Sequence, residues 1–250
     1  MKTNVLLSSI LILVASLFGF PGAAHQVLAQ DIIADEASPG VPIAREPHYH
    51  LVFQNFLVNV YEIEVAPGYA TLMHQHDYDN FFVVFGDADL TNAVAGENPT
   101  KLALPDLGIH FEREPYANII ANNGKLPLRN ITVELRQTQG QVTNVYSSIN
   151  DALKAAPPDD GGIRQAFVLG TDEVQVIAVA VPSDKAWAPP HDGRDRLVVM
   201  LDKINEGKSP FPAGMLAWFS ADTSLRVPNE SDRQMKLMIL EFNDTHEEVD

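Results

Sequence analysis

The stretch that decides the fold is PGYATLMHQHDYDNFFVVFG, residues 67–86. It opens with a Pro-Gly turn, carries two histidines one residue apart, and ends in an apolar, aromatic run typical of a buried strand. Side chains alternate between the two faces of a strand, so His74 and His76 are expected on one face. Asn80 keeps that parity, whereas Asp79 is expected to point away. Two imidazoles on one face either supply two of the four ligands of a metal site or are simply polar side chains on the exposed face of a strand.

The rest of the chain has a sequence pattern typical of short strands separated by turns. From residue 48 onward, apolar runs are separated by Pro-Gly and Asn-Asn-Gly turns. One helix is expected in YSSINDALKAA at residues 146–156, followed by a Pro/Gly-rich break, PPDDGG, at residues 157–162. Many short strands with almost no helix indicate an all-β sandwich or barrel.

The sequence after this break is similar to the sequence before it, which indicates an internal repeat. VQVIAVAVPSDKAWAPPHDGRDRLVVML resembles VNVYEIEVAPGYATLMHQHDYDNFFVVFG, and LRVPNESDRQMKLMILEF resembles NIIANNGKLPLRNITVEL. The alignment pairs Pro189 with His74, His191 with His76, Asp195 with Asn80, Leu225 with Asn118, and Asn229 with Asn122. We therefore predict an N-terminal domain at residues 48–140, a helical linker at 141–162 and a C-terminal domain at 163–243.

The N-terminus predicts export. Residues 1–29 combine Lys2, an apolar core and a small-residue cleavage site, VLA, as a signal peptide does. The apolar run is too short to span a bilayer, and no later segment is long and apolar enough to do so. We expect a mature protein that is secreted or periplasmic, with no membrane association after cleavage.

Composition restricts the partners and the metal chemistry. With 17 Lys+Arg against 33 Asp+Glu, the formal net charge of −16 repels phosphate, so nucleic acid and anionic membranes are not expected as partners. The chain has no cysteine, which excludes disulfides and thiolate ligands. Any metal must therefore be held by nitrogen and oxygen atoms.

The spacing of these residues resembles the motifs of the cupin superfamily. Its first motif is a glycine, five residues, HxH, three or four residues, a glutamate and, about six residues later, a glycine. Gly68, the two histidines, Asn80 and Gly86 stand at those places, and residues 118–124 match the second motif, H-x-V-x-N-x-G. The resemblance covers most of both halves. It implies a bicupin, two double-stranded β-helix (jelly-roll) barrels in tandem with little helix.

The resemblance also implies a divalent metal, Fe, Mn, Ni or Zn, held by His74 and His76 in the N-terminal barrel. Asn80 stands in the place of the family's glutamate and Asn118 in the place of its third histidine, so the motif is degenerate. Neutral amides hold such ions less well than carboxylate and imidazole. Additional candidates for ligands or pocket walls are His110 and Tyr116.

In the second half, only His191 and Asp195 remain of the ligand set, because Pro189 and Leu225 occupy the other places. The second barrel is therefore expected to be a structural or dimer-forming partner of the first, and a homo-oligomer is possible.

Two functions of different classes stay open. One is a metal-dependent dioxygenase or isomerase, in which the metal on the histidine pair polarises substrate oxygens or binds O₂. The other is a non-catalytic protein, structural or binding a small molecule through the amides of Asn80 and Asn118. The aromatic walls of such a pocket would be Phe81 or Phe82, Phe111 and Tyr116.

Overall fold

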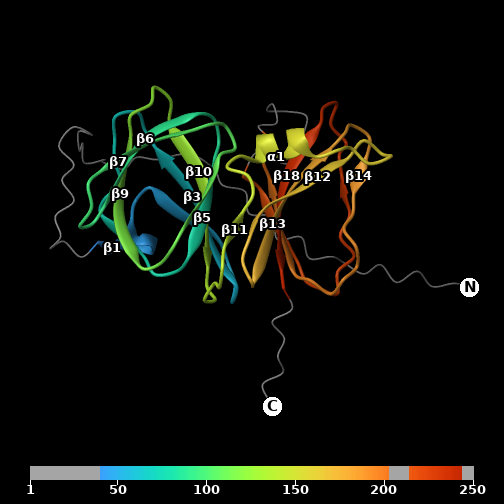
Figure 1. Cartoon of the computed structure of the whole chain (residues 1–250), viewed down its shortest axis with the longest axis horizontal. Coiled ribbons are helices and arrows are strands. Elements are labelled where there is room, and N and C mark those ends of the chain that lie inside the picture. The colour runs from blue at the N-terminus through green and yellow to red at the C-terminus, as the bar shows by residue number, and fades with distance from the viewer. Residues whose placement is uncertain (1–39, 203–213, 244–250) are drawn as a thin grey trace, which may run out of the picture.

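The computed structural model describes residues 40–202 and 214–243, which form two β-barrels, one from each half of the chain (Figure 1). The predicted export signal at residues 1–29 lies outside the described residues. Within the described part of the chain, no helix is long and apolar enough to cross a membrane. The predicted all-β architecture of two tandem barrels is confirmed.

The first barrel consists of two five-stranded sheets. One contains, in order, β1 (Val41–Pro42), β4 (His74–His76), β9 (Tyr116–Asn122), β6 (Ala88–Val94) and β7 (Thr100–Leu104). The other contains β2 (Tyr49–Gln54), β3 (Val58–Val65), β10 (Leu128–Leu135), β5 (Asn80–Val84) and β8 (Ile109–Glu112). A short 3₁₀ helix, η1 (Ile43–Arg45), follows β1. Gly68 and Gly86 take positive φ angles in the turns after β3 and β5, a conformation that glycine adopts without strain.

The second barrel is built around a six-stranded sheet. In order, its strands are β11 (Thr143–Asn144), β12 (Arg164–Gly170), β13 (Val174–Val181), β18 (Met235–Phe242), β15 (Arg196–Met200) and β16 (Leu216–Phe219). A second sheet pairs β14 (Ala186–Trp187) with β17 (Val227–Pro228). Helix α1 (Ile149–Ala155) confirms the predicted helical segment; it is capped by Ser148, whose hydroxyl accepts from the Asn150 amide.

The domain boundaries, residues 48–140, 141–162 and 163–243, stay a prediction.

The strand pairing supports the predicted repeat. Strands β3, β10 and β5 are neighbours in that order, and β13, β18 and β15 repeat the arrangement with the same pairing. The hairpin asparagines are equivalent as well. Asn122 Nδ2 donates to the carbonyls of Val65 and Leu126, and Asn229 Nδ2 donates to those of Val181 and Arg233. Each asparagine thus ties a hairpin to the end of the corresponding long strand, β3 or β13.

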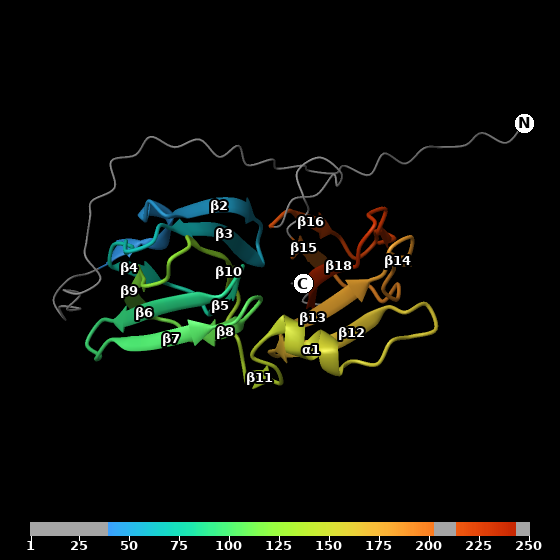
Figure 2. The ribbon, with the colours of Figure 1, turned by 90° about the horizontal axis from the view of Figure 1, so that it is seen from above.

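Both faces of the long strands are covered, one by the barrel interior and one by the other barrel. Strand β3 sends Val58 and Val60 into a core shared by the two barrels, and Ile63 and Val65 into its own barrel. Across the shared core, Phe53 of β2 stacks on Trp218 of β16, with ring centroids 5.8 Å apart. The view from above shows the two sheets facing each other (Figure 2).

Candidate functional site

The two histidines lie inside the first barrel, as their parity predicts. His74 and His76 are 0% and 2% exposed, and their ring centroids are 5.0 Å apart. Strand pairing places His74 directly opposite Asn118 of β9 and His76 opposite Tyr116. The structure thus brings together five of the predicted site residues, because Asn80 lies beside His76 and Tyr116 as well.

His74 is held as a neutral imidazole by two hydrogen bonds. Its Nδ1 lies 2.9 Å from the Leu72 carbonyl oxygen, which can only accept, so Nδ1 carries the proton. Its Nε2 therefore accepts from the hydroxyl of Tyr49 at 3.0 Å. Burial, reinforced by the neighbouring His76, lowers the pKa of His74 to about 4. At neutral pH both ring nitrogens are engaged with the protein.

Glu46 fixes the segment that leads into β4. Its Oε1 accepts from the Leu72 amide at 3.0 Å and lies 2.9 Å from His48 Nδ1. Burial works to raise the pKa of this carboxyl, but the hydrogen bonds from His48 and Leu72 outweigh it and lower the pKa. The ionised carboxylate therefore anchors the amide of Leu72, the residue whose carbonyl orients the His74 ring.

His76 is stacked against Tyr116 and borders Asn80 and Glu134. The rings of His76 and Tyr116 lie 4.7 Å apart at an angle of 12°. His76 Nδ1 is 3.4 Å from Asn80 Nδ2 and 3.5 Å from Glu134 Oε1. Asn80 Nδ2 also donates to the Tyr116 hydroxyl at 3.1 Å. Sequence reasoning finds three of these four residues and misses Glu134.

Asp79 points away from the site, as its parity predicts. Its carboxylate pairs with Arg113 at 2.7 Å and accepts from the Glu114 amide at 2.9 Å. This arrangement ties the start of β5 to the segment between β8 and β9.

Two buried oxygen atoms of the site have no hydrogen-bond partner. Glu134 is 1% exposed; its Oε2 accepts from Asn59 Nδ2 at 2.9 Å, while its Oε1 is unpartnered. Asn118 Nδ2 donates to Asn92 Oδ1 at 3.0 Å, and Asn118 Oδ1 is unpartnered. Within residues 40–202 and 214–243, these are the two buried side-chain polar atoms that have no hydrogen-bond partner. Both are acceptors, and an unsatisfied buried acceptor is costly.

A small hollow lies in the interior of this barrel. Its polar wall consists of Tyr49, His76, Asn80, Asn92, Glu112, Tyr116, Asn118, Asn130 and Thr132. Its apolar wall consists of Phe82, Leu90, Leu102, Ile120 and Leu128. Of the predicted aromatic walls, Phe82 and Tyr116 line the hollow. Phe81 and Phe111 do not, because alternation turns them to the core between the barrels.

His110 does not reach the histidine pair. It lies opposite Phe82, and its Nε2 is 3.0 Å from Glu112 Oε1. The hydrogen bond with Glu112 outweighs burial and raises the pKa of His110. Glu112 lies opposite Asn80 and lines the hollow, so this neighbouring strand supplies a carboxylate that sequence reasoning missed.

In the described residues of the second barrel, the places of the first barrel's polar site residues do not form an equivalent polar interior. His191 is exposed, and the Asp195 carboxylate accepts from the Ala221 amide at 2.8 Å, so these two residues do not form a site together. Leu225 is buried in an apolar cluster with Trp187 and Met200. The strand pairing also corrects the alignment by one residue: Arg196, not Asp195, takes the place of Asn80, because it lies opposite Glu241 as Asn80 lies opposite Glu134.

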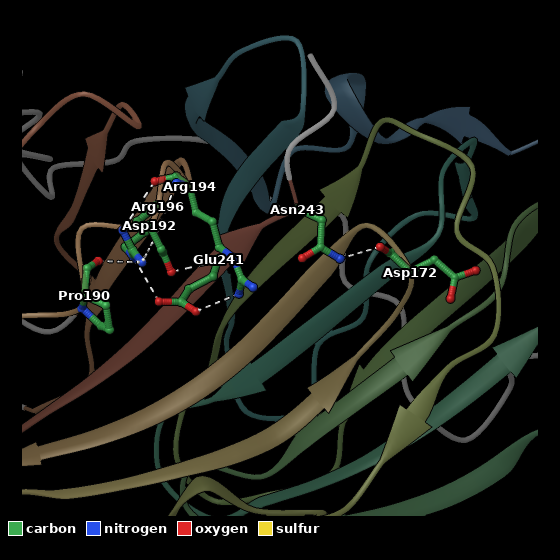
Figure 3. A network of polar contacts seen from close by, with 7 residues as sticks. All are labelled: Asp172, Pro190, Asp192, Arg194, Arg196, Glu241 and Asn243. Atoms are coloured by element: carbon green, nitrogen blue, oxygen red, sulfur yellow. Dashed lines mark hydrogen bonds and ion pairs between the residues drawn. The ribbon is translucent and has the colours of Figure 1, made fainter. Parts of the chain in front are cut away.

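Arg196 and Glu241 form the centre of a buried ion-pair network (Figure 3). Arg196 Nε donates to Glu241 Oε1 at 2.8 Å, and its Nη2 donates to Asp192 Oδ1 at 2.6 Å. Arg194 Nη1 lies 3.3 Å from the other oxygen of Glu241. In the second barrel, both oxygens of the buried glutamate are therefore paired with arginine.

The residues of the first barrel do not fit the transition metal that the sequence predicts. His74 Nε2, the nitrogen on the inner side, is taken by the Tyr49 hydroxyl. Neutral amides stand in place of the third histidine and the glutamate, and these are poor ligands for Fe, Mn, Ni or Zn. No group of three or more His, Asp or Glu residues in the described part of the chain is arranged to hold a metal ion.

Solved structures with the same architecture were found by comparison. AerE from Microcystis aeruginosa matches with a TM-score of 0.60 at 14% identity, over 82% of this chain and 97% of that one. Salicylate 1,2-dioxygenase from Pseudaminobacter salicylatoxidans matches with a TM-score of 0.56 at 11% identity, over 80% and 77%. This chain has the tandem cupin fold.

A glyoxylate-induced protein from Pseudomonas aeruginosa matches with a TM-score of 0.56 at 14% identity, over 94% of this chain and 97% of that one. No family model and no curated protein matches the sequence. At these identities the likeness shows the fold of the cupin chain, and its function must be argued from its own residues.

Proposed function

We propose that this cupin is a binding protein whose first barrel holds a small organic ligand through hydrogen bonds, without a transition metal. The observation that carries the proposal is the wall of the hollow. Four asparagines, two tyrosines, a threonine, a histidine and a glutamate share it with five apolar side chains. An apolar cavity with a few placed polar groups is typical of small-molecule sites.

The polar groups are fixed in place before a ligand arrives. Burial raises the pKa of the Tyr49 hydroxyl well above its usual value, and it raises that of Tyr116 as well. Both hydroxyls therefore keep their protons and remain donors. Tyr49 is held by His74, and Tyr116 by Asn80 and by stacking on His76. Ordered side chains of this kind lower the entropic cost of binding.

The second barrel supports the first. Its interior is filled by an apolar cluster that includes Leu225 in place of Asn118, and its sheet shares a core with the first barrel. The predicted export signal would place the protein in the periplasm or outside the cell, where a binding protein meets ligands from the surroundings.

The test is a screen of small hydrogen-bonding organic molecules by ligand-observed NMR. Wild-type protein is compared with Asn118→Leu, which introduces the residue of the second barrel, and with Asn144→Leu, a matched change at an exposed position. We expect hits that bind wild type and Asn144→Leu but not Asn118→Leu. Hits that bind all three forms equally, or no hits at all, would overturn the proposal.

A further inference from the structure

The two barrels place a glutamate at the same position and neutralise it differently. Strand β10 pairs with β5 so that Glu134 lies opposite Asn80, and β18 pairs with β15 so that Glu241 lies opposite Arg196. Glu134 and Glu241 are 1% and 7% exposed. The second repeat therefore places the cationic Arg196 opposite its glutamate, whereas the first repeat places the neutral amide of Asn80 there.

The first barrel has no arginine or lysine to replace that cation at the hollow. Its lining includes Glu112 and no Lys or Arg. Glu134 lies directly behind the wall, with its Oε1 3.5 Å from His76 Nδ1 and its strand neighbour Thr132 in the lining. Asn59 hydrogen-bonds to Glu134, and so does Tyr61, but both are neutral. A buried carboxylate without a paired cation is costly, and it makes the electrostatic potential of the hollow negative.

The two unpartnered atoms need the same kind of partner, a hydrogen-bond donor. Glu134 Oε1 and Asn118 Oδ1 are both acceptors, so a ligand satisfies them only by donating. The rings of Tyr49 and Tyr116 add faces that attract cations. Asn118 is part of the wall of the hollow, and Glu134 lies behind that wall.

We propose that the ligand of the first barrel carries a cationic N–H donor, a guanidinium or ammonium group, which takes the role that Arg196 has in the second barrel. This inference rests on the proposed function and specifies the chemical class of its ligand. The organic part of the ligand packs on the apolar wall of Phe82, Leu102 and Ile120. The cation lies beside Asn118 and the carboxylate of Glu112, with Glu134 behind the wall.

The test uses butylguanidinium, which copies the end of an arginine side chain, and butylurea, its neutral analogue of nearly the same shape. Both are titrated calorimetrically into the full mature chain. We expect butylguanidinium to bind wild type at least about tenfold more tightly than butylurea, a difference of about 1.4 kcal/mol. Glu134→Gln should reduce that preference at least fivefold. Glu97→Gln, the same charge change on an exposed turn, should leave it unchanged.

A second variant decides the matter if Glu134→Gln fails to fold. Asn80→Arg places an arginine opposite Glu134, as in the second barrel, and should abolish the preference for butylguanidinium. Equal binding of the two compounds to wild type, with loss of both in Asn118→Leu, overturns the cationic ligand and leaves the binding function standing. A preference that persists in Glu134→Gln or in Asn80→Arg overturns the cationic ligand too. If neither compound binds, and the NMR screen gives no hits, both proposals fail.

Discussion

Glu134 and Glu241 occupy the same position in the two repeats of this chain, but only Glu241 is paired with arginine. Glu241 Oε1 accepts from Arg196 at 2.8 Å, while Glu134 Oε1 has no hydrogen-bond partner. The repeat therefore provides an internal comparison: one barrel pairs its buried glutamate with arginine, and the other leaves one oxygen of its buried glutamate without a hydrogen-bond partner.

The ion pair of the second barrel should stabilise the fold. Arg196→Met leaves Glu241 buried without its main partner, and we expect a loss of about 3 kcal/mol in the free energy of unfolding. Urea denaturation measures it. Arg233→Met is the control, because Arg233 is exposed and its pair with Asp232 is a surface contact worth less than about 1 kcal/mol. Equal losses in the two variants would show that the buried ion pair stabilises the fold no more than the surface pair does.

Glu134→Gln should behave differently. The amide keeps an oxygen for Asn59 and removes a charge that no cation balances, so we expect the free energy of unfolding to change by less than about 1 kcal/mol or to rise. The same urea denaturation, run beside wild type, measures this. A loss above about 2 kcal/mol would mean that the first barrel already compensates the charge.

The hairpin asparagines should contribute equally to the two barrels. Asn122→Ala and Asn229→Ala each remove two buried donor contacts to backbone carbonyls, and we expect each to cost about 2 kcal/mol. Thermal unfolding of the two variants and of Asn144→Ala, an exposed control, checks this. A cost confined to one barrel would contradict the structural equivalence of the hairpins.

Stability should fall in acid because His74 is buried neutral. Its pKa is lowered to about 4 in the folded protein, from an ordinary value of about 6.5 in the unfolded chain, so the unfolded state binds more protons between these values. This group costs nothing at pH 7, and it lowers the free energy of unfolding by about 2 kcal/mol at pH 4.5. His74→Gln should lose that part of the pH dependence, whereas exposed His191→Gln should retain it. Identical pH profiles for the two variants would contradict the buried neutral imidazole.

Alternation along the strands made much of this site predictable. The inward face of the histidine pair, the parity of Asn80 and Asp79, and the repeat of the hairpin asparagines all follow from local spacing. Tyr49 and Glu112 could not be found in this way, because they reach the hollow from strands whose register is set by tertiary pairing. Glu134 had a signal: an acid stands at the same place in NITVEL and in MILEF of the aligned repeats.

The alignment was wrong by one residue at Asp195 for a related reason. The segment between β13 and β15, residues 182–195, is as long as residues 66–79 between β3 and β5, so the repeats align without a shift, and pairing with β18 shows that Arg196 faces the glutamate. The metal prediction depended on the histidine spacing and on the resemblance to the cupin motifs. Spacing does not show that the Tyr49 hydroxyl, from another strand, takes the inner nitrogen of His74.

The most direct test of the central claim is the metal content of the purified, full-length mature protein at neutral pH, where imidazole ligands are deprotonated. Elemental analysis after exposure to Fe, Mn, Ni and Zn should find far less than one ion per chain, and no difference between wild type and the His74→Ala/His76→Ala variant. One tightly held ion per chain, lost in that variant, would contradict a metal-free hydrogen-bonding site.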